Sequence, residues 1–108
     1  MIINFNEIKP STVEKMRGGE KQASLNRLDI DNKMIARITL EPSSSIGYHT
    51  HVEDEEIIYI ISGQGKCIDN GVETQIYEGQ VNYIPRGKSH SIINNSNKDL
   101  VLLAIIYK

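Results

Sequence analysis

The three histidines of the chain and one nearby glutamate have types and spacing that suit a metal centre. His49 and His51 are separated by one residue, and residues two apart on a β-strand point to the same face, about 6 to 7 Å apart. The acidic segment 52–55 predicts a connecting turn. Glu56 then opens the next strand, where antiparallel pairing can carry its carboxylate back beside the histidines. His90 heads a later predicted strand and can join the same cluster.

Imidazole nitrogens and a carboxylate oxygen form a mixed ligand set. Such a set suits a divalent transition metal, namely Mn, Fe, Co, Ni, Cu or Zn, at distances of roughly 2.0 to 2.3 Å. An octahedral metal with four protein ligands keeps two positions open, as a Lewis acid or an oxygen-activating centre requires. We therefore predict a metal centre made by His49, His51, Glu56 and His90, and assign no catalytic residue.

A frame of short strands is needed to bring these residues together. Lys33 to Glu41 alternates apolar and polar side chains with a period of two, which is typical of a strand, and Pro42 with three serines ends it. Later segments repeat at intervals of about ten residues, the rhythm of an antiparallel sandwich or barrel. The predicted strands are Ile46–His51, Glu56–Ser62, Gly65–Asp69, Glu73–Tyr77, Gln80–Ile84, His90–Asn94 and Leu100–Tyr107.

Two of these strands carry additional local signals. Asn70-Gly71 predicts a two-residue type I′ hairpin, because both residues tolerate positive backbone angles. The run from Leu100 to Ile106 is nearly all apolar, which predicts a strand covered on both faces. No helix of more than two turns is expected, so the sequence predicts an all-β protein.

The N-terminal part has weaker patterns. Within Pro10 to Arg17, Ser11 is followed three residues later by Glu14, which favours one short helical turn that Gly18-Gly19 ends. Residues 20–30 predict an edge strand or two. Because the segment Ala23 to Ile30 could pair with a neighbouring copy or cover an exposed edge, we expect a homodimer.

Composition limits the class of protein. A chain of 108 residues with a net charge of −2 and interspersed charges is expected to be one domain without a nucleic-acid-binding stripe. Its apolar runs are far shorter than the roughly 20 residues that span a bilayer, so no membrane is expected as a partner. The first seven residues lack a secretory signal pattern, and a lone cysteine, Cys67, fits a reducing compartment. The expected location is the cytoplasm.

Two motifs in the sequence resemble those of the cupin superfamily. The first, G-x5-H-x-H-x3-4-E-x6-G, is matched at His49, His51, Glu56 and Gly63. Its opening glycine departs from the pattern, because Gly47 lies two residues before His49. The second motif, G-x5-P-x-G-x2-H-x3-N, is matched at Gly79, Pro85, Gly87, His90 and Asn94. The short spacing between the motifs resembles compact, single-domain cupins.

The resemblance implies a double-stranded β-helix, the jelly-roll barrel, with a metal inside. It implies one cupin domain over 1–108, with N-terminal strands in 1–30, a barrel core in 31–108, the first motif at 47–63 and the second at 79–94. It also implies the ligand set His49, His51, Glu56 and His90. Glu55 is the rival carboxylate, but only Glu56 stands six residues before Gly63.

Several other residues have two interpretations each. Arg86 and Lys88 either draw an anionic substrate to the mouth or lie in a solvated turn. Glu53, Asp54 and Glu55 form an exposed turn unless one serves as acid or base. Cys67 is expected to be a small buried residue. The tyrosines that either line a pocket or serve in packing are Tyr48, Tyr59, Tyr77 and Tyr83.

Two functions fit a cupin of this kind. The first is a metal-dependent enzyme that acts on a small polar or anionic organic molecule, as a dioxygenase, decarboxylase or isomerase. The second is a non-catalytic module that binds a metal or a small molecule. No helix-turn-helix is predicted, which disfavours a DNA-binding sensor.

Overall fold

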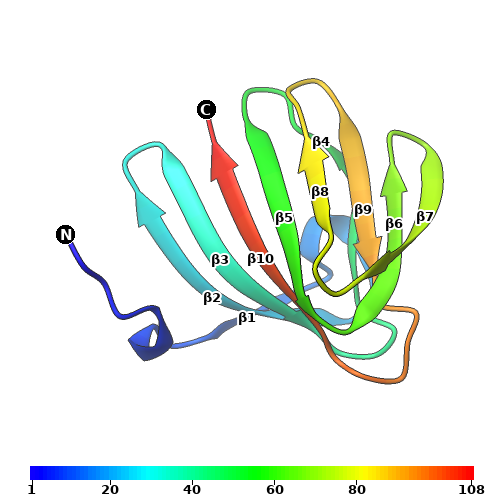
Figure 1. Ribbon diagram of the computed structural model, residues 1–108, viewed down its shortest axis with the longest axis horizontal. Coiled ribbons are helices and arrows are strands. Elements are labelled where there is room, and N and C mark those ends of the chain that lie inside the picture. Colours follow the sequence, from blue (N-terminus) through cyan, green and yellow to red (C-terminus); the bar gives the residue numbers. More distant parts are fainter.

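A computed structural model describes residues 1–108 and consists almost entirely of strands (Figure 1). The strands are β1 (Ser11–Glu14), β2 (Gln22–Ile30), β3 (Lys33–Leu40), β4 (Ser45–Thr50), β5 (Glu55–Ser62), β6 (Gln64–Asp69), β7 (Val72–Tyr77), β8 (Val81–Ile84), β9 (Ser89–Ile93) and β10 (Leu100–Tyr107). Two short 3-10 helices, η1 (Phe5–Glu7) and η2 (Met16–Gly18), lie in the N-terminal part. The predicted all-β class is confirmed. No helix is long and apolar enough to cross a membrane.

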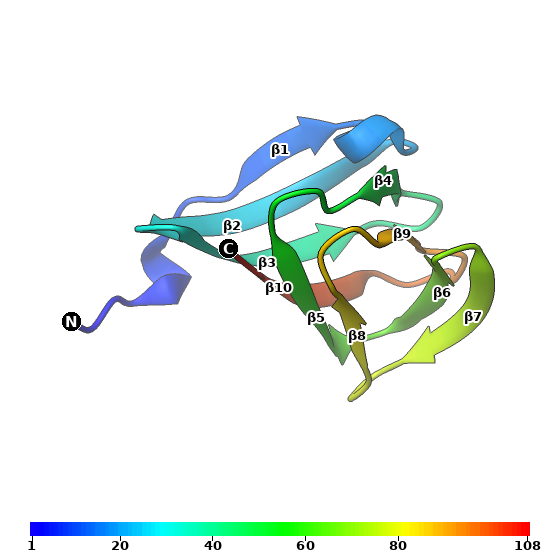
Figure 2. The same cartoon turned by 90° about the horizontal axis from the view of Figure 1, so that it is seen from above.

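Two antiparallel sheets face each other and enclose the core (Figure 2). The larger sheet has the order β1-β2-β3-β10-β5-β8, and the smaller has the order β4-β9-β6-β7. Fifteen buried apolar residues from both sheets form one core cluster. Burial of these side chains, at about 25 cal/mol per Å² of apolar surface, is the main force that holds the sheets together. The arrangement is the jelly-roll barrel that the resemblance to cupins implied.

The alternating pattern of β3 determines which face is buried. Met34, Ala36, Ile38 and Leu40 are buried, whereas the residues between them are half-buried. In a strand, alternate side chains point to opposite faces, so the apolar set lies in the core. The strand predicted over Lys33 to Glu41 is therefore confirmed.

The strands that were predicted after residue 45 occur within two residues of their expected bounds. Asn70 and Gly71 have φ of 48° and 89° and connect β6 to β7 in a two-residue turn, as predicted.

β10 is central in the larger sheet, between β3 and β5. Of its inward residues, Leu100, Leu102 and Ala104 are fully buried and Ile106 is partly buried, but the outward residues are all only half-buried, so the expectation that both faces are covered was wrong.

The predicted helical turn near the N-terminus was also wrong. Ser11–Glu14 is a strand that pairs with β2, and the turn that follows, η2, is a 3-10 helix. Pairing with β2 provides hydrogen-bond partners for the backbone of Ser11–Glu14, and Val13 packs against the core. The stabilisation from these contacts with a distant segment outweighs the local preference for a helical turn. β1 is thus the edge strand, but it pairs only with residues 22–25 of β2, so residues 26–30 have no strand beside them on that side.

Candidate metal centre

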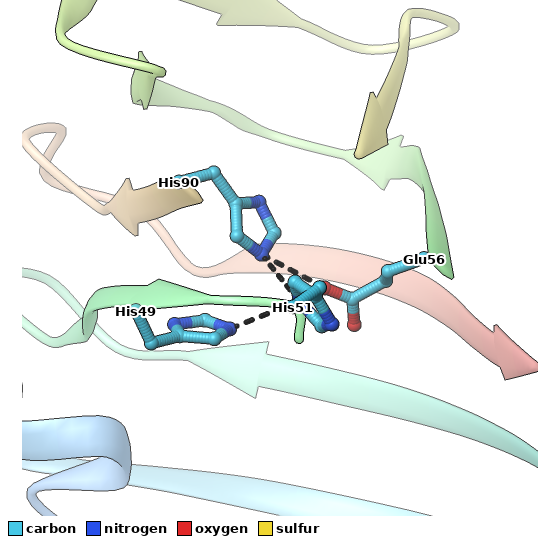
Figure 3. Close-up of side chains that lie close together, drawn as sticks. All are labelled: His49, His51, Glu56 and His90. Atoms are coloured by element: carbon cyan, nitrogen blue, oxygen red, sulfur yellow. Dashed lines mark hydrogen bonds and ion pairs between the residues drawn. The ribbon is translucent and has the colours of Figure 1, made fainter. Parts of the chain in front are cut away.

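Four predicted ligands converge between the two sheets (Figure 3). His49 is on β4 and His90 on β9 of the smaller sheet, Glu56 is on β5 of the larger sheet, and His51 follows β4 by one residue. Their ligand atoms all lie within 4.8 Å of one another. Three of the four side chains are buried, and only His49 is partly exposed.

Strand register and one bend bring the histidines together. His49 and His90 are direct partners across the β4–β9 pair. His51 lies outside the strand that was expected to include it, yet its backbone continues the pairing: its N–H donates to Lys88 O at 2.9 Å, and its carbonyl accepts from Gly87 N at 2.6 Å. Gly87 has φ of +86°, a conformation that glycine adopts without strain. The bend of the second motif therefore fixes a histidine of the first.

The structure places Glu56, not Glu55, in the cluster. Glu56 is buried, whereas the adjacent Glu55 points to the opposite face of β5 and accepts hydrogen bonds from the hydroxyls of Tyr83 (2.6 Å) and Tyr107 (3.2 Å). The bond to Glu55 raises the pKa of Tyr83 to about 12. Alternation along a strand thus separates the two candidate carboxylates.

Each histidine is oriented through its Nδ1 atom. His49 Nδ1–H donates to Gly47 O at 2.7 Å, and His51 Nδ1–H donates to Asp54 Oδ1 at 2.7 Å. A carbonyl or an ionised carboxylate can only accept, so the proton is on Nδ1 in both rings. Asp54, which the sequence suggested as part of an exposed turn, is therefore a positioning residue for His51.

Asn82 orients the ring of His90, as Asp54 orients that of His51. His90 Nδ1–H donates to Asn82 Oδ1 at 2.9 Å, and Asn82 Nδ2 donates to Asp69 Oδ2 at 3.3 Å, which fixes the orientation of the amide. Such outer partners set the tautomer of a ligating histidine. Asn82 was not predicted as a site residue. One signal was present in the sequence: Asn82 is polar, yet it lies on the same, inward face of β8 as the apolar Ile84.

The residues present fit a metal ion. With Nδ1 protonated on all three rings, each neutral ring directs an Nε2 lone pair into the cluster. The Nε2 atoms of His49 and His90 lie 3.2 Å from that of His51, and Glu56 Oε1 lies 3.1 Å from His51 and 2.9 Å from His90. Acceptors this close repel one another unless a cation or protons lie between them.

The same distances indicate a coordination geometry. Ligands at about 2.1 Å from a metal are about 3.0 Å apart at octahedral right angles and about 3.4 Å apart in a tetrahedron. Four of the six separations, at 2.9 to 3.2 Å, lie near the first value, and all six lie within 4.8 Å. These four separations are compatible with neighbouring octahedral positions.

Protonation differs among the four groups. Burial opposes ionisation of Glu56, but hydrogen bonds from His51 and His90, which form when their Nε2 atoms hold protons in place of a metal, outweigh it and lower the pKa of Glu56 to about 2. The hydrogen bond with Glu56 raises the pKa of His51 despite burial, whereas burial lowers the pKa of His49. In the metal-free protein, His51 thus holds a proton more readily than His49 does.

We expect the affinity for the metal to decrease as the pH is lowered, because protons compete with the metal for His51 Nε2. The pKa of His51 is raised, so competition begins above the ordinary histidine value of about 6.5. Each displaced proton weakens apparent affinity about tenfold per pH unit. Titration of Co²⁺ against a chromophoric chelator should show at least about tenfold weaker binding at pH 5.5 than at pH 7.5. A constant affinity over this range would contradict a histidine-rich site.

Adjacent glutamates offer a matched test of the carboxylate. Glu56→Gln should reduce affinity for Co²⁺ by about 100-fold, because an amide is a weaker ligand than a carboxylate and its NH₂ group can face the metal. Glu55→Gln should leave the affinity unchanged, since Glu55 bonds only to tyrosines outside the cluster. Competition titrations at one pH would compare the two variants, and equal losses in both would refute the assignment.

The remaining candidates lie outside the cluster. The four tyrosines are at least 40% exposed, and Tyr83 is bonded to Glu55, so they neither fill the core nor face the histidines. Cys67 is buried as expected, and burial raises the pKa of its thiol to about 11. Arg86 and Lys88 lie in the bend before β9, which is the solvated turn that was one of their two interpretations.

The facing sheets and the His/Glu cluster between them define a cupin-type barrel with a candidate metal site. The chain belongs to the cupin family, since residues 36–106 match the family model described as Cupin domain. It is 39% identical to an oxalate-binding protein of Thermotoga maritima, over 98% of this chain and 93% of the relative. A crystal structure of a predicted oxalate decarboxylase from Thermotoga maritima superposes with a TM-score of 0.93 at 37% identity, over 99% and 98% of the two chains. The polyketide cyclase RemF from Streptomyces resistomycificus shares the fold. The TM-score is 0.82 at 19% identity, and the match covers 99% of this chain and 78% of the cyclase chain.

Proposed function

We propose that His49, His51, Glu56 and His90 hold one divalent transition metal. The observation that carries this proposal is the clustering of three histidine ring nitrogens with one oxygen of a buried carboxylate. Mn, Fe, Co, Ni, Cu and Zn all accept this ligand set, and a six-coordinate ion held by four protein ligands would have two positions left for a bound molecule.

We further propose that the bound molecule is a small carboxylate, with oxalate as the best candidate. The name of the relative from Thermotoga maritima supports this choice. Carboxylate oxygens can occupy the open positions of such a metal, and the half-exposed His49 marks the side from which a ligand can approach.

Calorimetry with oxalate tests the proposed function. Protein loaded with Mn²⁺ or Co²⁺ should bind oxalate with a stoichiometry of about one, and the same protein stripped by a chelator should not. Acetate serves as a control, because it cannot chelate a metal through two carboxylates. Equal binding of oxalate by loaded and stripped protein would show that the metal has no part in recognition.

Turnover is a second candidate function, favoured by the predicted decarboxylase activity in the description of the related crystal structure. Decarboxylation of oxalate yields carbon dioxide and formate, so both products can be assayed in the solutions used for calorimetry. Metal-dependent release of formate would establish an enzyme. Binding without formate would leave the protein as a binding module.

A homodimer stays a prediction, and a second surface besides the expected edge of β2 supports it. The outer faces of β5 and β8 carry four adjacent apolar or aromatic side chains that are 40% to 61% exposed: Tyr59, Ile61, Val81 and Tyr83. Apolar patches of this kind often mark protein interfaces. Light scattering coupled to size-exclusion chromatography would give the solution mass, and a concentration-independent monomer would refute the dimer. The cytoplasmic location is likewise still a prediction.

A further inference from the structure

One edge of the larger sheet is only partly covered. β1 pairs only with residues 22–25 of β2. The N-terminal segment meets the same edge at Asn26, whose Nδ2 donates to Ile8 O at 2.7 Å. Beyond Asn26, residues 27–30 have no strand beside them, and Figure 1 shows this end of β2 at the margin of the sheet. A strand edge of this kind can pair with another chain.

Arg27 and Asp29 direct their backbone groups to this open side. Lys15 N donates to Lys21 O at 2.7 Å, which continues the β1–β2 register and shows that residue 21 bonds toward β1. In an antiparallel pair, every second residue bonds in the same direction, so the N–H and C=O groups of Arg27 and Asp29 point to the β1 side as well. No strand is there to receive them, and none of the backbone hydrogen bonds outside the ladders involves them.

The side chains of this edge match those of a second copy. Arg27 and Asp29 lie on the same face of β2 and form an ion pair (Nη2 to Oδ1, 3.0 Å) in which the two side chains are 52% and 62% exposed. Antiparallel pairing of two copies, with the Leu28 residues opposite each other, places Arg27 of each copy opposite Asp29 of the other. A two-fold axis requires such a match of one surface with itself.

The signs of the charges determine whether this edge attracts or repels another copy. Edge strands often carry charges that prevent association, which act by repulsion between like charges. On this edge a cation and an anion lie two residues apart, so each charged side chain of one copy lies opposite a charge of the other sign. The edge therefore favours association with a second copy.

We propose that residues 27–29 of β2 pair antiparallel with the same residues of a second copy, which joins the two larger sheets into one. This inference rests on the predicted homodimer and gives it a surface and a register. The pairing provides partners for the free backbone groups of Arg27 and Asp29 in both copies. Because the paired segment is short, the dimer is weak, with a dissociation constant in the micromolar range or above.

Charge reversal tests the pairing. Arg27→Glu places like charges opposite each other across the two-fold axis, and so does Asp29→Lys. Each variant should therefore dimerise at least about tenfold more weakly than the wild type. An equimolar mixture of the two variants should associate, because each presents opposite charges to the other, and the double variant Arg27→Glu/Asp29→Lys should dimerise like the wild type. Sedimentation equilibrium at several protein concentrations would give these dissociation constants.

Lys66→Glu is the matched control. It reverses the cation of an ion pair on the smaller sheet (Lys66 Nζ to Glu73 Oε1, 3.6 Å) and should leave association unchanged. A dimer that Arg27→Glu leaves as stable as the wild type, a mixture of the single variants that stays monomeric, or an equal loss in Lys66→Glu would overturn this inference alone. A wild type that is monomeric at every concentration would overturn it together with the predicted homodimer, and would leave the proposed metal centre untouched.

Discussion

His90→Ala should abolish tight metal binding while leaving the barrel folded. His90 supplies one of four ligand atoms, and even the loss of an outer partner of a ligand typically costs 10- to 100-fold in affinity. Loss of the ligand itself should therefore cost at least about 100-fold. Metal content after gel filtration, measured with circular dichroism and a thermal melt on the same sample, would check both parts of the prediction.

Ile92→Ala is the matched control for this variant. Ile92 lies two residues further along β9, faces inward like His90, and is fully buried. Its truncation should cost about 2 to 5 kcal/mol of unfolding free energy and leave metal binding intact. If His90→Ala retained full metal content, His90 would have to be removed from the ligand set.

Gly47→Ala should produce a large loss of stability. The new Cβ would lie 2.1 Å from Arg17 O and 2.8 Å from both Gly18 C and Gly19 N, which are all backbone atoms that cannot rotate away. Either η2 or β4 must therefore move. We expect a loss of about 3 kcal/mol, and roughly 15 °C in Tm for a domain of this size.

Gly79→Ala separates this steric effect from backbone strain. Gly79 has φ of +88°, but no atom lies within 4 Å of a Cβ built there. The substitution should cost only about 1 kcal/mol, through its conformation alone. Equal melting temperatures for Gly47→Ala and the wild type would show that η2 is not held against β4 as described.

Local patterns were sufficient to predict most strands. Side-chain alternation in β3 and the Asn70-Gly71 turn act over a few residues, so the sequence predicts them directly. β1 could not be found in this way, because Ser11–Glu14 is a strand only through its pairing with β2. Its local sequence favours a helical turn, and the competing contact comes from a distant part of the chain.

The candidate site shows the same division between local and non-local information. Spacing and resemblance predicted which four residues meet, and strand alternation explains why Glu56 rather than Glu55 is among them. The partners that orient the rings were harder to predict. Asp54 lies in an acidic turn that has an ordinary solvated interpretation, and Asn82 meets His90 only once β8 and β9 belong to facing sheets.

The metal content of protein purified without a histidine tag tests the central claim most directly. After loading with a divalent transition metal and removal of unbound ions by gel filtration, elemental analysis should find about one equivalent per chain. His90→Ala and Glu56→Gln should contain almost none, while Glu55→Gln should match the wild type. A wild-type protein that retains no metal after loading with any of the six candidate ions would contradict the proposed metal centre.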